Sequence, residues 1–354
     1  MSLLSVKTER VVSSAAEIIG HTPLLEFTRT GAGSRLLLKL EQFNPTGSTK
    51  VRMAREMILA AERAGALKPG GTIVEPTSGN TGLGLALVAI ERGYRFVAVV
   101  DHHASKDKLR AMQAMGVQLV VVDGSGEGPS TVERRRIAGE IARETGAFWP
   151  DQHYNPNNNI GYASLAEELL AGLATDVDYL VGAVGTGGTL CGTVQALRQR
   201  GSAVTSIGVE PKGSIIFGGP GGKYWQTGAG APAGFTVGPN VRHDLIDEGV
   251  TVSDIDAFTT ARVVARRTGL LIGGTAGAAI FIALKRLALV EPGSTLVALV
   301  CDAGEKYLDT VYDDAWLRER GLLNEPAHHR LHRLLSAFEE SQRLAAIDHA
   351  RTGT

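Results

Sequence analysis

Short hydrophobic runs alternate with longer amphipathic stretches along most of the chain. The short runs are continuously apolar and bounded by turn residues, which is typical of parallel strands buried on both faces. They occur at 36–40, 72–74, 96–100, 118–122, 179–183, 204–209 and 295–300. Helical patterns lie at 51–64, 81–92, 106–115, 131–145, 162–173, 190–200, 255–268 and 276–289. This alternation predicts right-handed βαβ units and therefore open parallel sheets of the α/β class.

Two further stretches depart from this alternation. Residues 217–240 are rich in glycine and predict a loop that is long enough to be functional. After about residue 323 the sequence becomes polar and rich in histidine, and we predict a peripheral helix with a frayed end. His328, His329 and His332 have a spacing typical of metal ligands, but their polar surroundings favour solvated side chains, so no metal site is expected.

Length and composition narrow the class of protein. The 354 residues favour two domains, at roughly 150 residues per domain. A net charge of -1 provides no general field for binding nucleic acid or an anionic membrane. The N-terminus lacks the apolar core of a signal peptide, and the two cysteines, Cys191 and Cys301, lie far apart. We therefore expect a cytoplasmic protein without a disulfide framework.

Lys50 is the first candidate for chemistry. It stands where an extended segment rich in glycine and proline meets the helical pattern at 51–64. The positive end of a helix dipole disfavours a cation at this place, which favours the neutral, nucleophilic amine. The alternative is an ordinary solvated lysine in a first helical turn.

A glycine-rich turn between a strand and a helix is the second candidate. It reads Gly185-Thr186-Gly187-Gly188-Thr189. Converging backbone amides at a helix N-terminus suit a phosphate monoester. The turn does not fit the dinucleotide fingerprint, because the third glycine would fall on Leu190.

A second turn of this kind follows the strand at 72–74. It reads Thr77-Ser78-Gly79-Asn80-Thr81-Gly82. Its amides, hydroxyls and carboxamide suit a carboxylate, although a simple capping turn, with Asn80 or Thr81 as the N-cap, is the alternative. An amine, a phosphate site and a carboxylate site together indicate an enzyme that uses pyridoxal 5'-phosphate (PLP) on an amino acid.

The residues also resemble a known family, the cysteine synthase/cystathionine β-synthase enzymes. The resemblance covers roughly residues 15 to 315. Four segments carry it in order, namely Pro45-Thr46-Gly47-Ser48-Thr49-Lys50, the two turns described above, and Gly273-Gly274-Thr275-Ala276-Gly277. Asp302-Ala303-Gly304-Glu305-Lys306-Tyr307 is also similar to the family's closing Asp-x-Gly-Glu-Arg-Tyr segment.

The resemblance implies a fold and an assembly. The fold would be the tryptophan synthase β-like PLP fold (fold type II), with two three-layer open-sheet domains. The smaller, mobile domain would span 44–146, and the larger would combine 10–43 with 147–322. Residues 323–354 would form a peripheral tail. A homodimer is expected, acting on small amino-acid substrates.

The resemblance also implies roles for individual residues. Lys50 would bind the cofactor covalently and move the α-proton of the substrate, and Asn80 would bind the phenolic oxygen of the cofactor. The remaining assignments are Thr77, Ser78, Gly79, Thr81 and Gln152 for the substrate carboxylate, Gly185, Thr186, Gly187, Gly188 and Thr189 for the cofactor phosphate, Thr275 for the pyridine nitrogen, and Gly228 for the substrate entrance.

Thr275 bears on the reaction. A hydroxyl cannot hold a full proton on the pyridine nitrogen as an aspartate can, so the ring becomes a weaker electron sink. This favours loss of a β-substituent over transamination. We therefore expect β-elimination from an activated serine to an aminoacrylate, followed by addition of a nucleophile, which together amount to β-replacement.

Departures from the family pattern bear on the substrates. Lys50-Val51-Arg52 replaces the usual Lys-Asp-Arg, and Ser164-Leu165-Ala166-Glu167-Glu168 replaces Thr-Thr-Gly-Pro-Glu. Lys212-Gly213-Ser214-Ile215-Ile216-Phe217-Gly218 is similar to the branch that makes N-(2-amino-2-carboxyethyl)-L-glutamate from O-phosphoserine and glutamate. In that branch an arginine at the position of Arg136 would meet the substrate phosphate, whereas a solvated helix-face arginine is the alternative.

The donor favoured by these features is O-phosphoserine, with O-acetylserine as the second choice. The nucleophile stays open between an amine such as glutamate and a sulfur compound such as sulfide or thiosulfate. Two other functions remain. One is a serine/threonine dehydratase, and the other is a non-catalytic paralogue that binds a partner protein.

Overall fold

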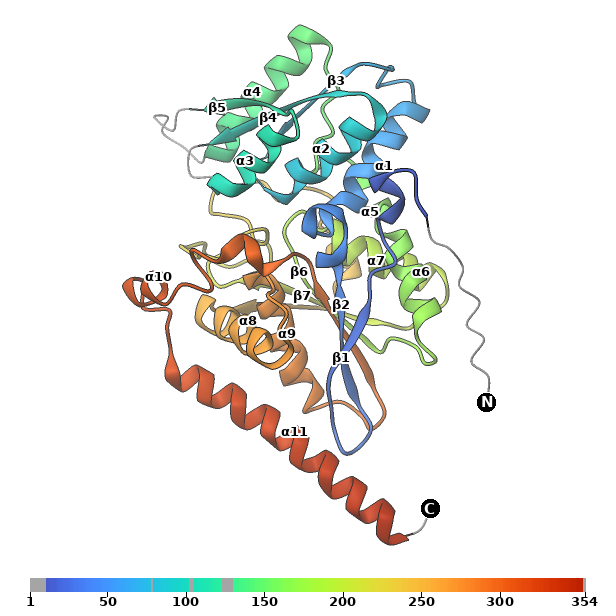
Figure 1. The fold of residues 1–354 in the computed structure, drawn as a ribbon, viewed down its shortest axis with the longest axis vertical. Helices are drawn as coiled ribbons and strands as arrows, with labels where there is room; N and C mark the ends of the chain where they lie inside the picture. The colour runs from blue at the N-terminus through green and yellow to red at the C-terminus, as the bar shows by residue number, and fades with distance from the viewer. Residues whose placement is uncertain (1–10, 78, 102–104, 123–129, 353–354) are drawn as a thin grey trace.

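The computed structural model describes residues 11–77, 79–101, 105–122 and 130–352. All seven predicted strands are present, and helices alternate with them as expected. The strands form two sheets, a smaller one above a larger one in the view of Figure 1. The long C-terminal helix lies at the end of the molecule that is farthest from the smaller sheet.

The larger sheet has six strands in the order β1-β2-β9-β6-β7-β8. They are β1 (Leu24–Arg29), β2 (Arg35–Leu40), β6 (Tyr179–Ala183), β7 (Thr205–Pro211), β8 (Glu248–Val252) and β9 (Thr295–Val300). All neighbours are parallel except β1, which pairs antiparallel with β2. The two edge strands, β1 and β8, were not predicted. Both are only partly buried, so they lack the continuous apolar run that identified the other strands.

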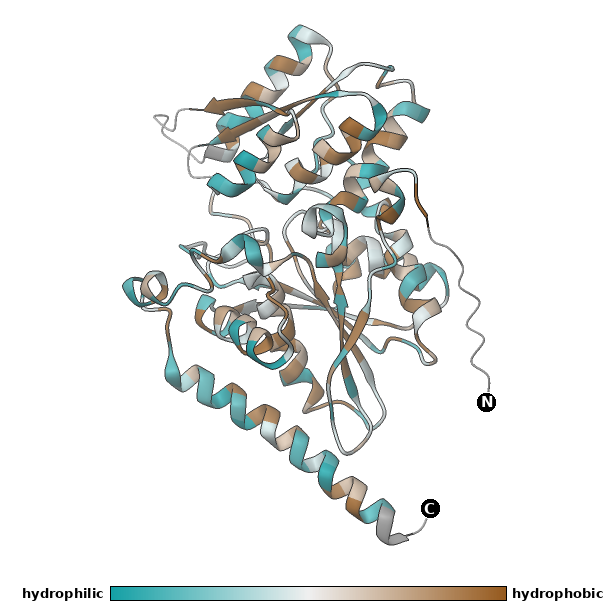
Figure 2. Ribbon diagram, viewed as in Figure 1, coloured by the Kyte–Doolittle hydropathy of each residue, from teal (hydrophilic) through white to brown (hydrophobic). Residues whose placement is uncertain are grey.

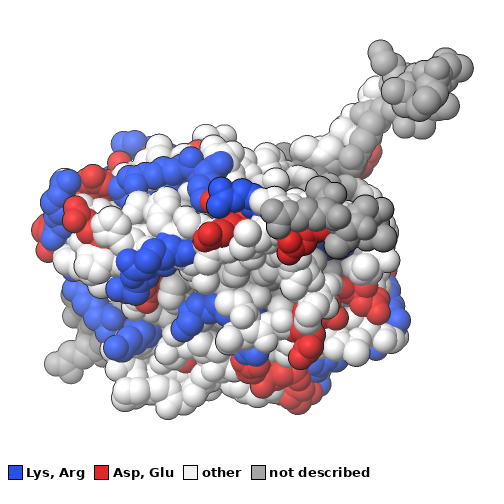
Figure 3. Space-filling view, turned by 90° about the horizontal axis from the view of Figure 1, so that it is seen from below, with Lys and Arg blue, Asp and Glu red and all other residues white. Residues whose placement is uncertain are grey.

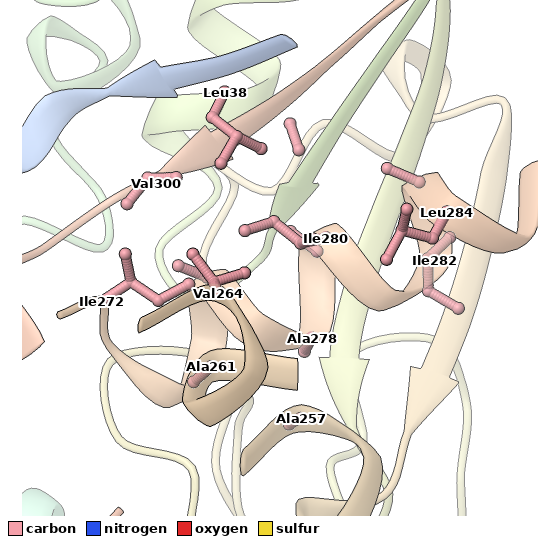
Figure 4. Packing of buried hydrophobic residues seen from close by; sticks show 14 of the residues in the cluster. Leu38, Ala257, Ala261, Val264, Ile272, Ala278, Ile280, Ile282, Leu284 and Val300 are labelled. Carbon is pink, nitrogen blue, oxygen red and sulfur yellow. The ribbon is translucent and has the colours of Figure 1, made fainter. Parts of the chain in front are cut away.

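Helices cover both faces of this sheet. One face is packed against α9 (Gly274–Leu287), which carries α8 (Asp254–Thr268) on its outer side, and the other against α7 (Gly188–Gln199) and α6 (Ala163–Gly172). Strand β2 shows the alternation, since Leu36 and Leu38 enter one core and Leu37 enters the other. Figure 4 shows Leu38 and Val300 of the sheet facing Ile280 of α9.

Helices α8 and α9 approach each other closely through small residues. Ala257, Ala261 and Ala278 line this contact in Figure 4. A methyl group on Gly277 would lie 2.1 Å from the carbonyl oxygen of Ala257, so only glycine permits the approach.

The smaller sheet has three parallel strands in the order β3-β4-β5. They are β3 (Thr72–Pro76), β4 (Arg95–Asp101) and β5 (Gln118–Val122). Val97 and Val99 of β4 pack towards α4 (Ser130–Thr145), whereas Ala98 and Val100 pack towards α2 (Asn80–Arg92) and α3 (Lys106–Ala114). Both sheets are thus the centre of three layers, which confirms the predicted fold class. The boundaries of the two domains stay a prediction.

Helix α1 (Lys50–Arg63) packs against both halves of the molecule, that is, the smaller sheet with its helices and the larger sheet with its helices. Val51 and Ile58 lie in the core beneath the smaller sheet, whereas Met53 and Met57 lie in the core of the larger sheet. Because one helix is buried in two cores, its first residue, Lys50, is placed at the junction between them.

A buried cluster of charges fixes the start of α1. Arg52, 3% exposed, pairs with Glu41 at 2.7 Å and with Glu168 of α6 at 2.8 Å. Lys39 of β2 also pairs with Glu168, at 2.7 Å. Burial opposes the charge of Glu168, but hydrogen bonds and positive charge from Arg52 outweigh it and lower the pKa of this carboxyl to about 2.

Helix α11 (Glu325–Thr352) is the predicted tail helix, but it is packed rather than merely peripheral. Its buried side chains, Ala327, Leu331, Leu335 and Phe338, recur every three or four residues and face α8 and β1. In Figure 2 the rest of the helix surface is largely hydrophilic.

The surface carries charges of both signs. Figure 3 shows Lys and Arg interspersed with Asp and Glu over one face of the molecule. Exposed pairs of this kind, such as Arg29 with Glu26 at 2.7 Å, each contribute little to stability. Within the described residues, no helix is long and apolar enough to cross a membrane.

The packing of α11 can be tested by truncating one buried side chain. Leu335 is 0% exposed, and we expect Leu335→Ala to lower the free energy of unfolding by about 2–5 kcal/mol, because it leaves a cavity. Leu344→Ala is the matched control on the same helix, since Leu344 is 54% exposed and should change stability by less than about 0.5 kcal/mol. Urea unfolding measures both. Equal, small effects would show that α11 does not pack as described.

Candidate active site

A cavity of about 950 Å³ lies where the segments that follow several strands meet. Thr77 follows β3, Gly185 follows β6, and Asp302 follows β9, and all three line this cavity together with Lys50. Ligands of open parallel sheets bind outside the carboxyl ends of the strands, because the connecting turns converge there. The turns predicted from sequence are thereby brought to one site.

Lys50 is the first residue of α1 and lines the cavity. Ahead of it the chain passes through left-handed backbone at Thr46, with φ +70°. The hydroxyl of Ser48 then accepts a hydrogen bond from the Lys50 backbone amide at 3.1 Å. In the described parts of the chain, the Lys50 amine has no hydrogen-bond or ion-pair partner. It is therefore available to a ligand.

The turn after β3 surrounds the start of α2. Thr77, Gly79, Asn80 and Thr81 line the cavity, whereas Ser78 lies outside the described residues. The capping alternative is wrong in its detail. The N-cap residue is Gly79, and Asn80 is already helical. The Asn80 carboxamide instead contacts Asp302 and Lys306 of the larger half.

Gln152 closes this turn from the opposite side. The hydroxyl of Thr81 donates to Oε1 of Gln152 at 2.7 Å, and both side chains line the cavity. The predicted partners of a substrate carboxylate therefore lie together. Their role stays a prediction.

Glu75 holds Gln152 in place from behind. The Glu75 side chain is buried in β3, and its oxygens accept the backbone amides of Asp151 at 2.9 Å and Gln152 at 3.3 Å. Asp151 itself has φ +48°, a left-handed conformation that these bonds stabilise. Burial raises the pKa of Glu75 to about 8.

The glycine-rich turn forms the start of α7. Gly187 is the N-cap, with φ +88°, and it has no side chain with which to satisfy the first amides of the helix. A methyl group there would lie 2.3 Å from the Asn240 carbonyl oxygen, and one on Gly188 would lie 1.9 Å from Oδ1 of Asn158. Gly185 and Thr186 line the cavity, while Gly188 and Thr189 begin the helix behind them. The close approach of the backbone and the free helical amides suit a phosphate.

Thr275 and Gly228 complete the wall that belongs to the larger half. Thr275 is the second residue of α9, is 5% exposed and lines the cavity. Gly228 lines it too and has φ +92° in the glycine-rich loop. Behind this loop, the Ser214 hydroxyl accepts the amide of Ala231 at 2.9 Å. The segment 212–218 therefore contacts the loop from behind, and it is not among the described residues that line the cavity.

Arg136 lies elsewhere. Its side chain is 54% exposed and pairs with Glu133 and Glu140 on the same helix, α4. It is not among the described residues that line the cavity, whereas Arg134 is. Two residues along a helix correspond to about 200° of rotation, which carries Arg136 to the opposite side of α4. The solvated alternative is the one the structure supports.

The lining residues that were not assigned from sequence include three charged ones at one corner, namely Lys108, Asp302 and Lys306. Oδ2 of Asp302 accepts Nδ2 of Asn80 at 2.8 Å and the hydroxyl of Tyr307 at 2.5 Å. The Lys108 amine, 4.6 Å from the centroid of the Tyr307 ring, is buried. For Asp302 and Lys306, similarity of the segment 302–307 to the family was the signal in the sequence, and it carried no role; Lys108 had no such signal.

The residues present fit PLP. The cavity holds the Lys50 amine, which has no partner among the described residues, a helix start shaped by glycines for an anion, and the buried hydroxyl of Thr275. The cavity is also large enough for a cofactor together with an amino acid.

Comparison with known proteins gives the same class. Residues 15–302 match the family described as pyridoxal-phosphate dependent enzyme, and the chain belongs to this family. A relative from Sinorhizobium fredii, named putative cysteine synthase, is 48% identical over 315 residues, which cover 88% of this chain and 94% of the relative.

Solved structures agree. An O-acetylserine-dependent cystathionine β-synthase from Helicobacter pylori has a TM-score of 0.79 at 33% identity, covering 85% of this chain and 99% of that one. O-ureido-L-serine synthase has a TM-score of 0.78 at 35% identity, covering 87% and 99%. Within the PLP enzymes, the chain belongs to the cysteine synthase/cystathionine β-synthase group. The predicted family, cofactor and enzyme class are confirmed.

Because the buried carboxyl of Glu75 supports Gln152, we expect the free energy of unfolding to depend on pH. Because burial raises the pKa of Glu75 to about 8, the folded protein keeps this proton above pH 4.5 while the unfolded chain loses it. The free energy of unfolding should therefore fall as the pH rises from about 5 to 8. Glu75→Gln does not titrate, but its Nε2 cannot accept a backbone amide, so it loses one of the two hydrogen bonds at every pH. Relative to the wild type, its stability should therefore rise between pH 5 and pH 8 by on the order of 1–4 kcal/mol.

Urea unfolding at three pH values measures this difference. The matched control is Glu319→Gln, because it makes the same change of charge at a side chain that is 73% exposed. A Glu75→Gln difference that does not change between pH 5 and 8 would mean that Glu75 titrates at its ordinary pKa.

Proposed function

We propose that the protein catalyses β-replacement on an activated L-serine, with PLP bound in the cavity. The observation that carries this proposal is the convergence on one cavity of Lys50, the Thr81–Gln152 pair and the start of α7. A free amine, a carboxylate site and a phosphate site are the groups needed to hold PLP together with an amino acid.

Each group has a distinct task. When bound, PLP withdraws electrons from the α-carbon of the amino acid and so eases loss of the α-proton and of the β-substituent. Lys50 would bind the cofactor covalently, and its released amine would then take the α-proton. The amides at the start of α7 would hold the phosphate, and Thr275 would meet the ring nitrogen with a hydroxyl.

The substrate is oriented by the opposite wall. Thr81 and Gln152, together with the backbone after Thr77, would bind its α-carboxylate, so that the α-proton faces Lys50. Asn80 would contact the phenolic oxygen of the cofactor. Gly228 and its loop would leave space for the second substrate to enter.

The donor is an L-serine whose hydroxyl carries an acetyl or phosphoryl group. O-phosphoserine was favoured from the sequence, but Arg136, which helped to support it, is exposed and paired with Glu133. O-acetylserine is supported by the solved H. pylori enzyme, which depends on it. The similarity at 212–218 remains the support for O-phosphoserine.

The acceptor that we favour is a sulfur nucleophile. The S. fredii relative is named putative cysteine synthase, and cystathionine synthesis also adds a thiol. An amine such as glutamate is the second candidate. Cytoplasmic location and a homodimer remain predictions.

The proposed reaction can be tested with a panel of substrates. The holoenzyme is given O-acetylserine, O-phosphoserine or serine, each with sulfide, thiosulfate, homocysteine or glutamate, and the products are identified by mass spectrometry. We expect replacement with an activated donor and a sulfur acceptor, and ping-pong kinetics. Pyruvate released equally fast without any acceptor would instead identify a dehydratase.

Lys50 can be tested in the same assay. Lys50→Ala should abolish covalent cofactor binding and lower turnover by at least about a hundredfold, because a general base contributes about 10²–10⁴-fold. Lys68→Met is the matched control, since Lys68 is an exposed lysine outside the cavity wall. A Lys50→Ala variant that keeps both the cofactor absorbance and the turnover would overturn the assignment. Wild-type protein that never binds PLP would favour a binding function.

A further inference from the structure

Lys306 makes an unusually complete set of contacts for a lysine. It lies in the 3-10 helix η5 (Gly304–Tyr307), which follows β9 of the larger sheet. Its amine donates to the carbonyl oxygens of Thr46 at 2.8 Å and Gly47 at 2.9 Å, and to Oδ1 of Asn80 at 2.7 Å. An ammonium group has three protons, and here each one has an acceptor.

Two of these acceptors lie on the loop that leads into Lys50. Thr46 has φ +70° and Gly47 has φ +64°, so the backbone is left-handed at two consecutive residues, one of them with a β-branched side chain. Such a conformation is costly for threonine and persists only where contacts enforce it. The two carbonyls turn towards one point, and Lys306 occupies that point.

The third acceptor is the carboxamide of Asn80. Its oxygen accepts from Lys306, while its nitrogen donates to Oδ2 of Asp302 at 2.8 Å. A lysine can only donate and a carboxylate can only accept, so the two ends of the carboxamide cannot exchange places. The Nδ2 group of Asn80 therefore lies on the side of Asp302 and Tyr307, and its oxygen lies on the side of Lys306.

We propose that Lys306 is a positioning residue, whose ammonium group fixes both the loop before Lys50 and the orientation of Asn80 for the bound cofactor. The proposal rests on the proposed function in so far as Lys50 and Asn80 contact PLP. The new element is Lys306 itself, which contacts both the loop before Lys50 and the Asn80 carboxamide. It lies 226 residues away from Asn80 in sequence.

The surroundings of Lys306 make these contacts sensitive to pH. Burial lowers the pKa of Lys306 to about 8, with Asp302 and Glu305 opposing the shift and Lys108 of α3 adding to it. Tyr307 on the same segment, Cys301 beside Asp302 and Lys50 on α1 are further titratable groups that line the cavity. A neutral amine has only two protons for the three acceptors, so one contact must be lost when Lys306 deprotonates.

Substitution of Lys306 tests this role on the holoenzyme without any donor or acceptor. The variants are Lys306→Met, which removes the donors, and Lys306→Arg, which keeps the charge but does not titrate near pH 8. Lys68→Met is the matched control. The measurements are the dissociation constant of PLP and the absorbance of the bound cofactor between pH 6.5 and 9.5, with circular dichroism and thermal unfolding of the apoprotein to monitor folding.

We expect Lys306→Met to weaken PLP binding about tenfold to a hundredfold, because charge-assisted hydrogen bonds are lost and each 1.4 kcal/mol is tenfold in affinity. In the wild type the cofactor absorbance should show an inflection near pH 8, which Lys306→Arg should lack while binding PLP more tightly than Lys306→Met. Lys68→Met should match the wild type in both measurements.

Two results would overturn the proposal. One is a folded Lys306→Met variant that binds PLP as tightly as the wild type. The other is an inflection near pH 8 that persists unchanged in Lys306→Arg. Both readouts are independent of the substrates, so a wild type that shows them but fails the substrate panel would refute only the proposed β-replacement.

Discussion

The cluster around Arg52 is the constraint on which the geometry of the site depends. Arg52 stands two residues after Lys50, and it joins α1 to Glu41, beyond the end of β2, and to Glu168 on α6. Separating such buried partners is strongly unfavourable, because an uncompensated charge would remain out of water. The first turn of α1 therefore has one stable position against the larger sheet.

Three consecutive residues of α1 serve three purposes. The side chain of Lys50 lines the cavity, Val51 enters the core beneath the smaller sheet, and Arg52 enters the charge cluster. Successive residues on a helix point about 100° apart, so three neighbouring side chains of one turn can lie in the cavity, in the core and in the charge cluster. Val51, where the family has an aspartate, is 0% exposed, and here it contributes packing.

Local patterns were sufficient to predict much of the fold and the principal turns. The buried parallel strands have continuous apolar runs, and the turn before α7 was identified by its glycines, although the contact with Asn240 that requires glycine at 187 could not be read from the sequence. The edge strands β1 and β8 were not predicted, because they are only partly buried and lack a continuous apolar run. Arg136 was chosen by resemblance, but the phase of α4 directs it to solvent. Contacts such as Lys306 with Thr46 join residues that are distant in sequence, and no local pattern encodes them.

Lys50 and Lys306, two of the lysines that line the cavity, differ in how their amines are held. In the described structure the Lys50 amine has no partner, whereas all three protons of Lys306 are engaged. An amine that must react has to be free of strong contacts, and an amine that must hold a loop has to be saturated with them. The left-handed backbone at Thr46 connects the two, because Lys306 stabilises the conformation from which Lys50 enters the cavity. In our proposal, the nucleophile Lys50 is thus placed by a second lysine, whose amine cannot itself serve as a nucleophile while its contacts hold.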